Sequence, residues 1–241
     1  MIRATVASEW TKLWSVRSTW WALVGALAVM LLSSVQVAFW VDNGDELTGS
    51  SATDVAVEAF SVAQLAVLAL AMLAVTNEYS HRTMRATLQW TPARTRVLLA
   101  KAVVVAAVTA AAGAVLAVGG AAAAAPILTD PPSPDLADLA AIAVVSALLG
   151  LLALGLGAAL RGAVLTLVVL FLLLILVPPL LAAPDIAALT WVADLSPGPA
   201  ASHFLSGDGD PYPPAVGAAV TAAWSAAALF VGGRVMRRRD A

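Results

Sequence analysis

The sequence predicts an all-α integral membrane protein with six transmembrane helices, and three observations support that prediction. Of the 241 residues, 61% are hydrophobic and only 12% are charged, whereas a soluble domain usually has about 25% charged residues. The charged residues also leave six long windows that contain no charge at all. Basic and acidic residues, in turn, segregate to alternate connections between those windows.

Each uncharged window is close to or above the length needed to cross a bilayer as a helix. The windows comprise residues 18–41, 59–77, 102–129, 139–160, 162–184 and 211–233. A helix crossing roughly 30 Å of hydrocarbon needs about 20 apolar residues, because each residue rises about 1.5 Å. Within a single membrane domain, residues 1–241, we expect spans at about 19–41, 56–76, 98–125, 137–160, 162–181 and 214–233. A soluble helical protein is disfavoured because segments such as 165–177 have no polar stripe.

All 13 basic residues fall on one side of the predicted bundle. Of the 15 acidic residues, only Glu9, Glu78 and Asp240 share that side. The positive-inside rule assigns the basic side to the cytoplasm, so both termini are expected there. The net charge of −2 therefore conceals a basic inner face that suits anionic lipid or an acidic protein surface.

The N-terminal segment, about residues 2–18, predicts an amphipathic helix. Its apolar residues recur at helical spacing, namely Val6, Trp10, Leu13 and Trp14. We expect an elbow helix that lies in the inner membrane interface before the first span. The alternative is that this segment simply extends the first span into the cytoplasm.

The longest inner connection joins the second and third spans, at about residues 77–91. Within it, residues 80–89 can form a short separate helix. Thr91 followed by Pro92 is typical of an N-cap and a first helical position, so the third span is expected to begin as a helix at Pro92.

Prolines interrupt the predicted helices in the second half of the chain. We expect Pro178 and Pro179 to break the fifth span, since proline lacks a backbone donor and clashes with the preceding turn. The segment that follows, about residues 182–213, is long and moderately apolar. It is expected either to re-enter the membrane or to cap the outer end of a cavity.

The inventory of reactive side chains argues against an enzyme. The chain has no cysteine and only two histidines, His81 and His203, which are expected on opposite sides of the membrane. No metal site or Ser-His arrangement can form from them. A phosphate-binding loop is also absent, because the only lysines, Lys12 and Lys101, are preceded by Thr and Ala. We therefore expect no catalytic residues, no metal and no cofactor in this chain, and no nucleic-acid partner.

Three segments carry a family resemblance. They are residues 8–21 (SEWTKLWSVRSTWW), residues 78–88 (EYSHRTMRATL), and residues 91–94 (TPAR) leading to residues 98–101 (LLAK). In these segments the chain resembles the membrane (permease) subunit of an ATP-binding-cassette exporter of the type-2 permease class, in its small actinobacterial form. One departure is Arg82, where family members often have glycine.

The resemblance implies an elbow helix, six spans and a coupling helix that rests in a groove of a separate ATPase subunit. ATP and Mg would bind to that partner, in a bacterial plasma membrane, and a second permease chain would complete a homo- or heterodimer. The implied contacts to the ATPase subunit are Glu78, Tyr79, Arg82, Thr83, Arg85, Leu88, Thr91 and Pro92.

Two function classes are open at this point. One is the permease subunit of an ATP-driven exporter, which forms the translocation pathway. The alternative is a non-transporting membrane scaffold or sensor subunit that recruits a cytoplasmic partner through its basic inner face. A membrane-embedded enzyme is a distant third, for the reasons given above.

Overall fold

The computed structural model describes residues 2–44, 51–80, 94–129, 133–207 and 209–238. Within these ranges every regular element is a helix. Six helical runs are long and apolar enough to cross a membrane, namely α2 (Arg17–Asp42), α3 (Ala52–Ser80), α5 (Arg94–Ala124), α6 (Leu136–Leu160), α7 to α8 (Ala163–Ala182) and α11 (Pro214–Arg238). The predicted all-α fold with six apolar helices is confirmed, and the chain is a multi-pass membrane protein.

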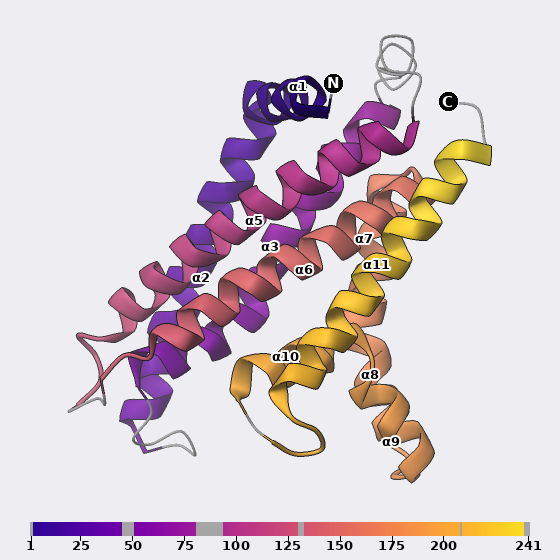
Figure 1. Ribbon diagram of the computed structural model, residues 1–241. Helices are drawn as coiled ribbons and strands as arrows, with labels where there is room; N and C mark the ends of the chain where they lie inside the picture. The colour runs from indigo at the N-terminus through magenta and orange to yellow at the C-terminus, as the bar shows by residue number, and fades with distance from the viewer. Residues whose placement is uncertain (1, 45–50, 81–93, 130–132, 208, 239–241) are drawn as a thin grey trace.

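Two helices, α3 and α6, form the centre of the bundle (Figure 1). α3 packs against α2, α5 and α6, and α6 packs against α3, α5 and α11. The peripheral helices α2, α7 and α11 expose large apolar side chains, for example Leu32, Val164 and Phe230. Such a surface is unfavourable in water but is solvated by acyl chains in a bilayer.

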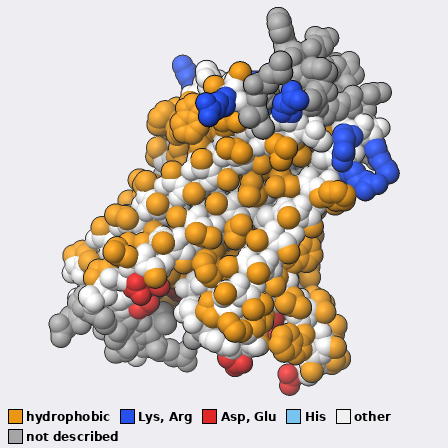
Figure 2. Space-filling model, viewed as in Figure 1, with side chains coloured by type: hydrophobic (Ala, Val, Ile, Leu, Met, Phe, Trp, Pro, Cys, Tyr) orange, Lys and Arg blue, Asp and Glu red, His pale blue; other side chains and the backbone are white. Residues whose placement is uncertain are grey.

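Charge is separated along the long axis of the folded chain. Both termini lie at the same end of the bundle (Figure 1). Figure 2 shows Lys and Arg at that end and Asp and Glu at the opposite end, with a hydrophobic band between them. The charge pattern expected from the sequence is therefore visible on this face, and the cytoplasmic location of the basic end stays a prediction of the positive-inside rule.

The N-terminal segment forms a separate helix, α1 (Ile2–Ser15), that lies across the ends of the longer helices (Figure 1). Val16 has an extended backbone, with φ −97° and ψ 124°, and α2 begins at the next residue. The segment is thus not an extension of the first span, and its helix ends at Ser15 rather than at residue 18. Thr19 stabilises the corner, because its buried Oγ1 donates a hydrogen bond of 2.7 Å to the carbonyl oxygen of Leu13.

The predicted break at Pro178 and Pro179 is wrong. α7 (Ala163–Phe171) continues through a π-helical turn, η1 (Leu172–Leu176), into α8 (Val177–Ala182). The prolines occupy the first turn of α8, where a missing backbone N–H costs least. The π-helical turn immediately before them shifts the hydrogen-bond register, so the helix accommodates both prolines without ending.

The segment between the fifth and sixth spans contains two short helices, α9 (Ala187–Asp194) and α10 (Pro197–Ser206). α10 packs against α11, α6 and η1, whereas α9 contacts mainly α8 and projects from the bundle (Figure 1). Trp191 and Val192 on α9 are exposed. One helix therefore covers the end of the bundle opposite the termini, and the other presents apolar side chains away from it.

α6 and α11 approach each other closely at two glycines. A Cβ atom added at Gly155 would lie 2.5 Å from the backbone nitrogen of Leu229, and one added at Gly232 would lie 2.6 Å from the carbonyl oxygen of Gly155. Real Cβ atoms do not make such contacts, so this interface requires residues without a side chain. Across the same interface, Ser225 Oγ donates a 2.7 Å hydrogen bond to the carbonyl oxygen of Leu148.

Replacing Gly155 with valine is therefore expected to lower the free energy of unfolding by about 1–3 kcal/mol, because the two backbones must separate. The matched control is Gly25→Val on α2, since nothing lies within 4 Å of a Cβ added there. Thermal unfolding in detergent would measure both variants. Equal destabilisation of the two would show that close packing of α6 on α11 is not the cause.

Candidate functional site

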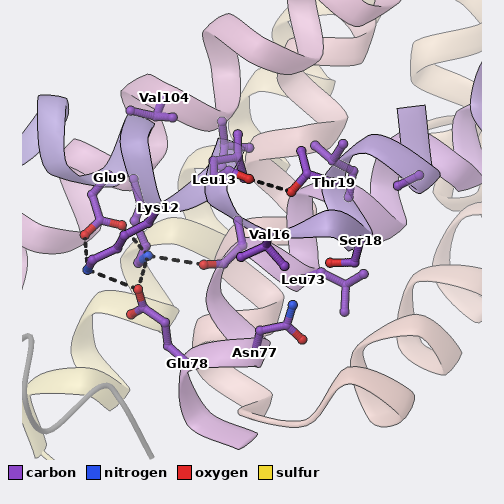
Figure 3. Close-up of a pocket in the computed structure, with 15 residues that line it drawn as sticks. Glu9, Lys12, Leu13, Val16, Ser18, Thr19, Leu73, Asn77, Glu78 and Val104 are labelled. Atoms are coloured by element: carbon purple, nitrogen blue, oxygen red, sulfur yellow. Dashed lines mark hydrogen bonds and ion pairs between the residues drawn. The ribbon is translucent and has the colours of Figure 1, made fainter. Parts of the chain in front are cut away.

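Four charged side chains from three helices meet where α1 crosses the bundle (Figure 3). Lys101 of α5 lies at the centre, and its Nζ donates to Glu9 Oε2, to Glu78 Oε1 at 2.8 Å and to the carbonyl oxygen of Ala74 at 3.2 Å. Lys12 Nζ lies 2.7 Å from Glu9 Oε1 and 3.3 Å from Glu78 Oε1. We call Glu9, Lys12, Glu78 and Lys101 the ion cluster.

Most of the ion cluster is shielded from solvent. The exposed fraction of the side chain is 3% for Glu9, 5% for Lys101 and 13% for Glu78, whereas Lys12 is 42% exposed. Burying an ion costs several kcal/mol, and only close pairing with an opposite charge offsets that cost. The cluster meets this condition, because two ammonium groups balance two carboxylates and each carboxylate contacts both lysines.

Helical spacing explains why the cluster forms at this point. Glu9 and Lys12 lie three residues apart on α1, so they share one face of that helix. Leu13 is buried beside them in a small apolar cluster with Leu70, Val104 and Val108. Lys101 precedes the two valines at positions i+3 and i+7, so the same face of α5 that receives Leu13 also presents the central ammonium group.

The environment raises the pKa of Lys12. Burial alone lowers this pKa, but the hydrogen bond to Glu9 and the charges of Glu78 and Glu9 outweigh the effect of burial. Because the pKa of Lys12 in the folded state lies above the ordinary value for lysine, its ion pairs stabilise the fold fully at any pH below that ordinary value. This stabilisation is lost only as the pH rises through the still higher pKa of the folded state. Lys12 is therefore positively charged throughout the physiological range.

The four residues predicted to face the membrane interface from α1 have different environments. Leu13 is buried, and Val6 and Trp14 pack against its apolar cluster, while Trp10 is 46% exposed. The rings of Trp10 and Trp14 lie 5.6 Å apart, and those of Trp14 and Trp20 lie 4.9 Å apart. Three of the four side chains thus hold α1 on the bundle, and the location of α1 in the membrane interface stays a prediction.

Two of the eight predicted contacts to an ATPase subunit are described, and both interact within the chain. Glu78 belongs to the ion cluster, and the guanidinium of Arg161 lies 5.1 Å from the centroid of the Tyr79 ring. The prediction that these residues contact an ATPase is not tested by this geometry. Of the predicted short helix at 80–89, Ser80 belongs to α3 and the other residues lie outside the described part of the chain. The predicted helix start at Pro92 also lies outside it, as do the other six contacts, namely Arg82, Thr83, Arg85, Leu88, Thr91 and Pro92.

Arg161 connects the end of α3 to the second half of the bundle. It occupies the turn between α6 and α7 with a left-handed backbone, φ 60°. Besides contacting the Tyr79 ring, it donates a 3.5 Å hydrogen bond from Nη2 to the carbonyl oxygen of Val235 on α11. Glu78 therefore links α3 to α1 and α5 through the ion cluster. The next residue, Tyr79, links α3 to the α6–α7 turn and to α11 through Arg161.

Sequence reasoning missed the pairing of Glu9, Lys12 and Lys101 and the role of Arg161. One signal was present, because Glu9 and Glu78 are the only acidic residues on the predicted basic side apart from Asp240 near the C-terminus. Two carboxylates close to an apolar bundle need cationic partners. The identity of those partners depends on which helices are neighbours, and the sequence pattern does not specify that.

A cavity of about 90 Å³ lies next to the ion cluster, between α1, α2, α3 and α5 (Figure 3). Its polar lining includes Lys12, Ser18, Asn77 and Glu78. The rest of its wall is apolar and includes Ala22, Leu70 and Leu73. In the described part of the chain, no three His, Cys, Asp or Glu side chains are placed to hold a metal ion.

No protein-family model and no curated protein matches the chain. The site is therefore interpreted from its own residues and from the three segments that carry the family resemblance. All three segments contribute to the ion cluster. Glu9 and Lys12 come from residues 8–21, Glu78 comes from residues 78–88, and Lys101 ends residues 98–101.

Proposed function

We propose that this chain is the permease subunit of an ATP-driven ATP-binding-cassette exporter in a bacterial plasma membrane. It pairs with a second permease chain to form the translocation pathway, and a separately encoded ATPase subunit supplies the energy. One observation supports this function above the others, namely that the charges of all three resembling segments meet in one buried cluster. Chance similarity in three short segments would not require their charged residues to be in contact.

The position of the ion cluster suits the transmission of force from a cytoplasmic partner. Residues 81–93 connect α3 to α5. Glu78 lies in the last turn of α3, and Lys101 lies about two turns after the start of α5. Because Lys101 bonds to both Glu78 and Glu9, displacement of the connection acts on α1, α3 and α5 together. Through Tyr79 and Arg161 the same displacement reaches the α6–α7 turn and α11. A packed bundle of this kind moves as rigid units rather than by continuous deformation.

A scaffold or sensor subunit would not need this linkage between the helices. Its basic inner face alone would recruit an acidic partner, and nothing in that role calls for three helices joined at the ends of one connection. The permease function uses both features, because docking requires the inner face and alternating access requires transmission of the movement. The ATPase is expected in the partner, so hydrolysis of ATP by the purified chain alone would contradict this division of roles.

The test is affinity purification of the tagged protein from native membranes in mild detergent, with mass spectrometry of the proteins that copurify. We expect a soluble ATPase that contains a phosphate-binding loop. Its recovery should fall about tenfold or more with Arg82→Ala/Arg85→Ala, since each substitution removes a charged contact predicted for the partner. The charge-matched control is Arg237→Ala/Arg238→Ala, at exposed positions at the end of α11, which should leave recovery unchanged.

Each contrary result has a distinct meaning. If wild-type protein recovers no ATPase, the permease function is wrong and the scaffold is favoured. If the Arg82→Ala/Arg85→Ala protein recovers as much ATPase as wild type, the partner docks elsewhere on the inner face.

A further inference from the structure

The last turns of α11 carry exposed arginines directly beside an exposed apolar surface. Phe230 and Val231 are 58% and 50% exposed, and the exposed residues Arg234, Arg237 and Arg238 follow within about two turns. Figure 2 shows Lys and Arg side chains at this end of the bundle, next to the hydrophobic band. The apolar face of the last span thus passes into a basic surface, as the bilayer passes from hydrocarbon to headgroups.

Arg234 lies at the boundary between these two surfaces. Its guanidinium carbon is 5.6 Å from the centroid of the Phe230 ring, and Phe230 is one turn nearer to the middle of the span. The contact with the ring therefore keeps the charge beside the apolar surface. A basic side chain at the end of a span ordinarily extends away from the hydrocarbon, toward water. A cation held at this level is stabilised by an anion at the same level, and lipid phosphates lie there.

Arg238 adds a second positive charge on the same face. It follows Arg234 by four residues, so the two side chains start about 6 Å apart along the helix axis. Like charges at this spacing repel each other. α11 contains no acidic residue, and neither arginine forms an ion pair with another described residue. This pair of arginines therefore favours an anion from another molecule.

The exposed apolar side chains distinguish a lipid from an acidic protein as the source of that anion. An acidic protein surface would meet the arginines but would not cover Phe230 and Val231, which lie toward the middle of the span. A phospholipid meets both features, because its phosphate is joined to acyl chains that extend toward the middle of the bilayer. The planar guanidinium group also matches a phosphate well, since it can donate two parallel hydrogen bonds.

We propose that this end of α11 binds the headgroup of an anionic phospholipid, of the phosphatidylglycerol class, in the leaflet next to the two termini. The phosphate accepts hydrogen bonds from the guanidinium groups of Arg234 and Arg238, and an acyl chain lies along Phe230 and Val231. A zwitterionic headgroup fits less well, because its cation adds to the positive charge already present. The inference requires a bilayer around the chain but not an ATPase partner.

The test is native mass spectrometry of the purified chain with phosphatidylglycerol and phosphatidylcholine that have identical acyl chains. Both lipids carry a phosphate, so the comparison measures the effect of the net charge of the headgroup. We expect phosphatidylglycerol to bind about tenfold more tightly, because each arginine near the lipid surface favours an anionic headgroup.

Two variants test whether this preference arises on α11. Arg234→Gln/Arg238→Gln keeps two polar side chains but removes both charges, and should reduce the preference to about twofold or less. The matched control is Arg3→Gln/Arg17→Gln, which removes two charges at exposed positions of α1 and α2 and should retain most of the preference.

Three results would each overturn the proposal. The first is equal binding of the two lipids by wild type. The second is an equal loss of preference in both variants, which would show that the basic end of the bundle attracts anionic lipid without a site on α11. The third is a preference that survives Arg234→Gln/Arg238→Gln, and loss of the copurifying ATPase from that variant would then identify this surface as a docking site for protein.

Discussion

Replacing Lys101 with methionine is expected to lower the free energy of unfolding by about 3–5 kcal/mol, the cost of removing one partner from a buried ion pair. Methionine preserves much of the length and volume of the side chain but removes the charge that lies between Glu9 and Glu78. Of the cations in the ion cluster, the two carboxylates would then retain Lys12, which is 42% exposed. Glu9 is only 3% exposed, so solvent screens little of its uncompensated charge.

Unfolding of the purified protein in mixed detergent micelles, followed by circular dichroism, would measure this effect. The matched control is Lys12→Met, which removes the same charge from the exposed side of the ion cluster and should cost about 1 kcal/mol or less, because solvent screens that pair. Adding Glu9→Gln to Lys101→Met should restore most of the lost stability, because it removes the uncompensated carboxylate. If Lys101→Met costs no more than Lys12→Met, the buried pair does not stabilise α1 on the bundle.

The membrane helices could be predicted from the sequence because their main determinant is local. A window without charges, such as residues 139–160, already specifies where a helix can lie in lipid, and α6 extends it by three residues to Leu136. The extension ends at Asp135, whose Oδ1 accepts a 2.8 Å hydrogen bond from the backbone nitrogen of Ala137. Helix ends thus follow capping and polar side chains, which a hydropathy window does not include.

The path of the fifth span shows where a local rule was insufficient. Proline was expected to end the helix, but the outcome depends on the backbone just before it, where η1 provides a wider turn. A π-helical turn has no strong sequence signature, because it depends on how the helix packs against its neighbours. At this point α10 lies against η1, and a Cβ atom added at Gly198 would lie 3.1 Å from the Cα atom of Leu174.

The ion cluster was beyond prediction for a different reason. Glu9 and Lys101 are 92 positions apart in the sequence, so their contact depends on which helices lie side by side. The charge pattern identifies Glu9 and Glu78 as carboxylates in need of cationic partners, but thirteen basic residues were available on that side. Only the crossing of α1 over α3 and α5 selects Lys101 as the central partner.

The cluster also changes how Glu78 should be tested. The family resemblance implies that Glu78 touches the ATPase, yet its carboxylate contacts Lys12 and Lys101 of its own chain and its side chain is only 13% exposed. We therefore expect Glu78 to act mainly in transmitting movement from the connection at residues 81–93 to the bundle. Under that hypothesis the ATPase should bind to a Glu78 variant but should no longer drive the permease effectively.

Glu78→Gln is accordingly expected to retain the ATPase in affinity purification and to lower ATP-driven movement of the bundle about tenfold, equivalent to about 1.4 kcal/mol of coupling free energy. Glutamine keeps the shape of the side chain but loses the charge that attracts both lysines. Because the chain contains no cysteine, spin labels can be attached through Thr11→Cys on α1 and Val231→Cys on α11, both exposed positions. The distance between the labels with and without ATP then reports the movement.

The matched control is Glu58→Gln, an exposed acid on the same helix, which should behave as wild type. Loss of the ATPase from Glu78→Gln would instead indicate a direct contact, and full movement with the ATPase bound would show that Glu78 serves neither role.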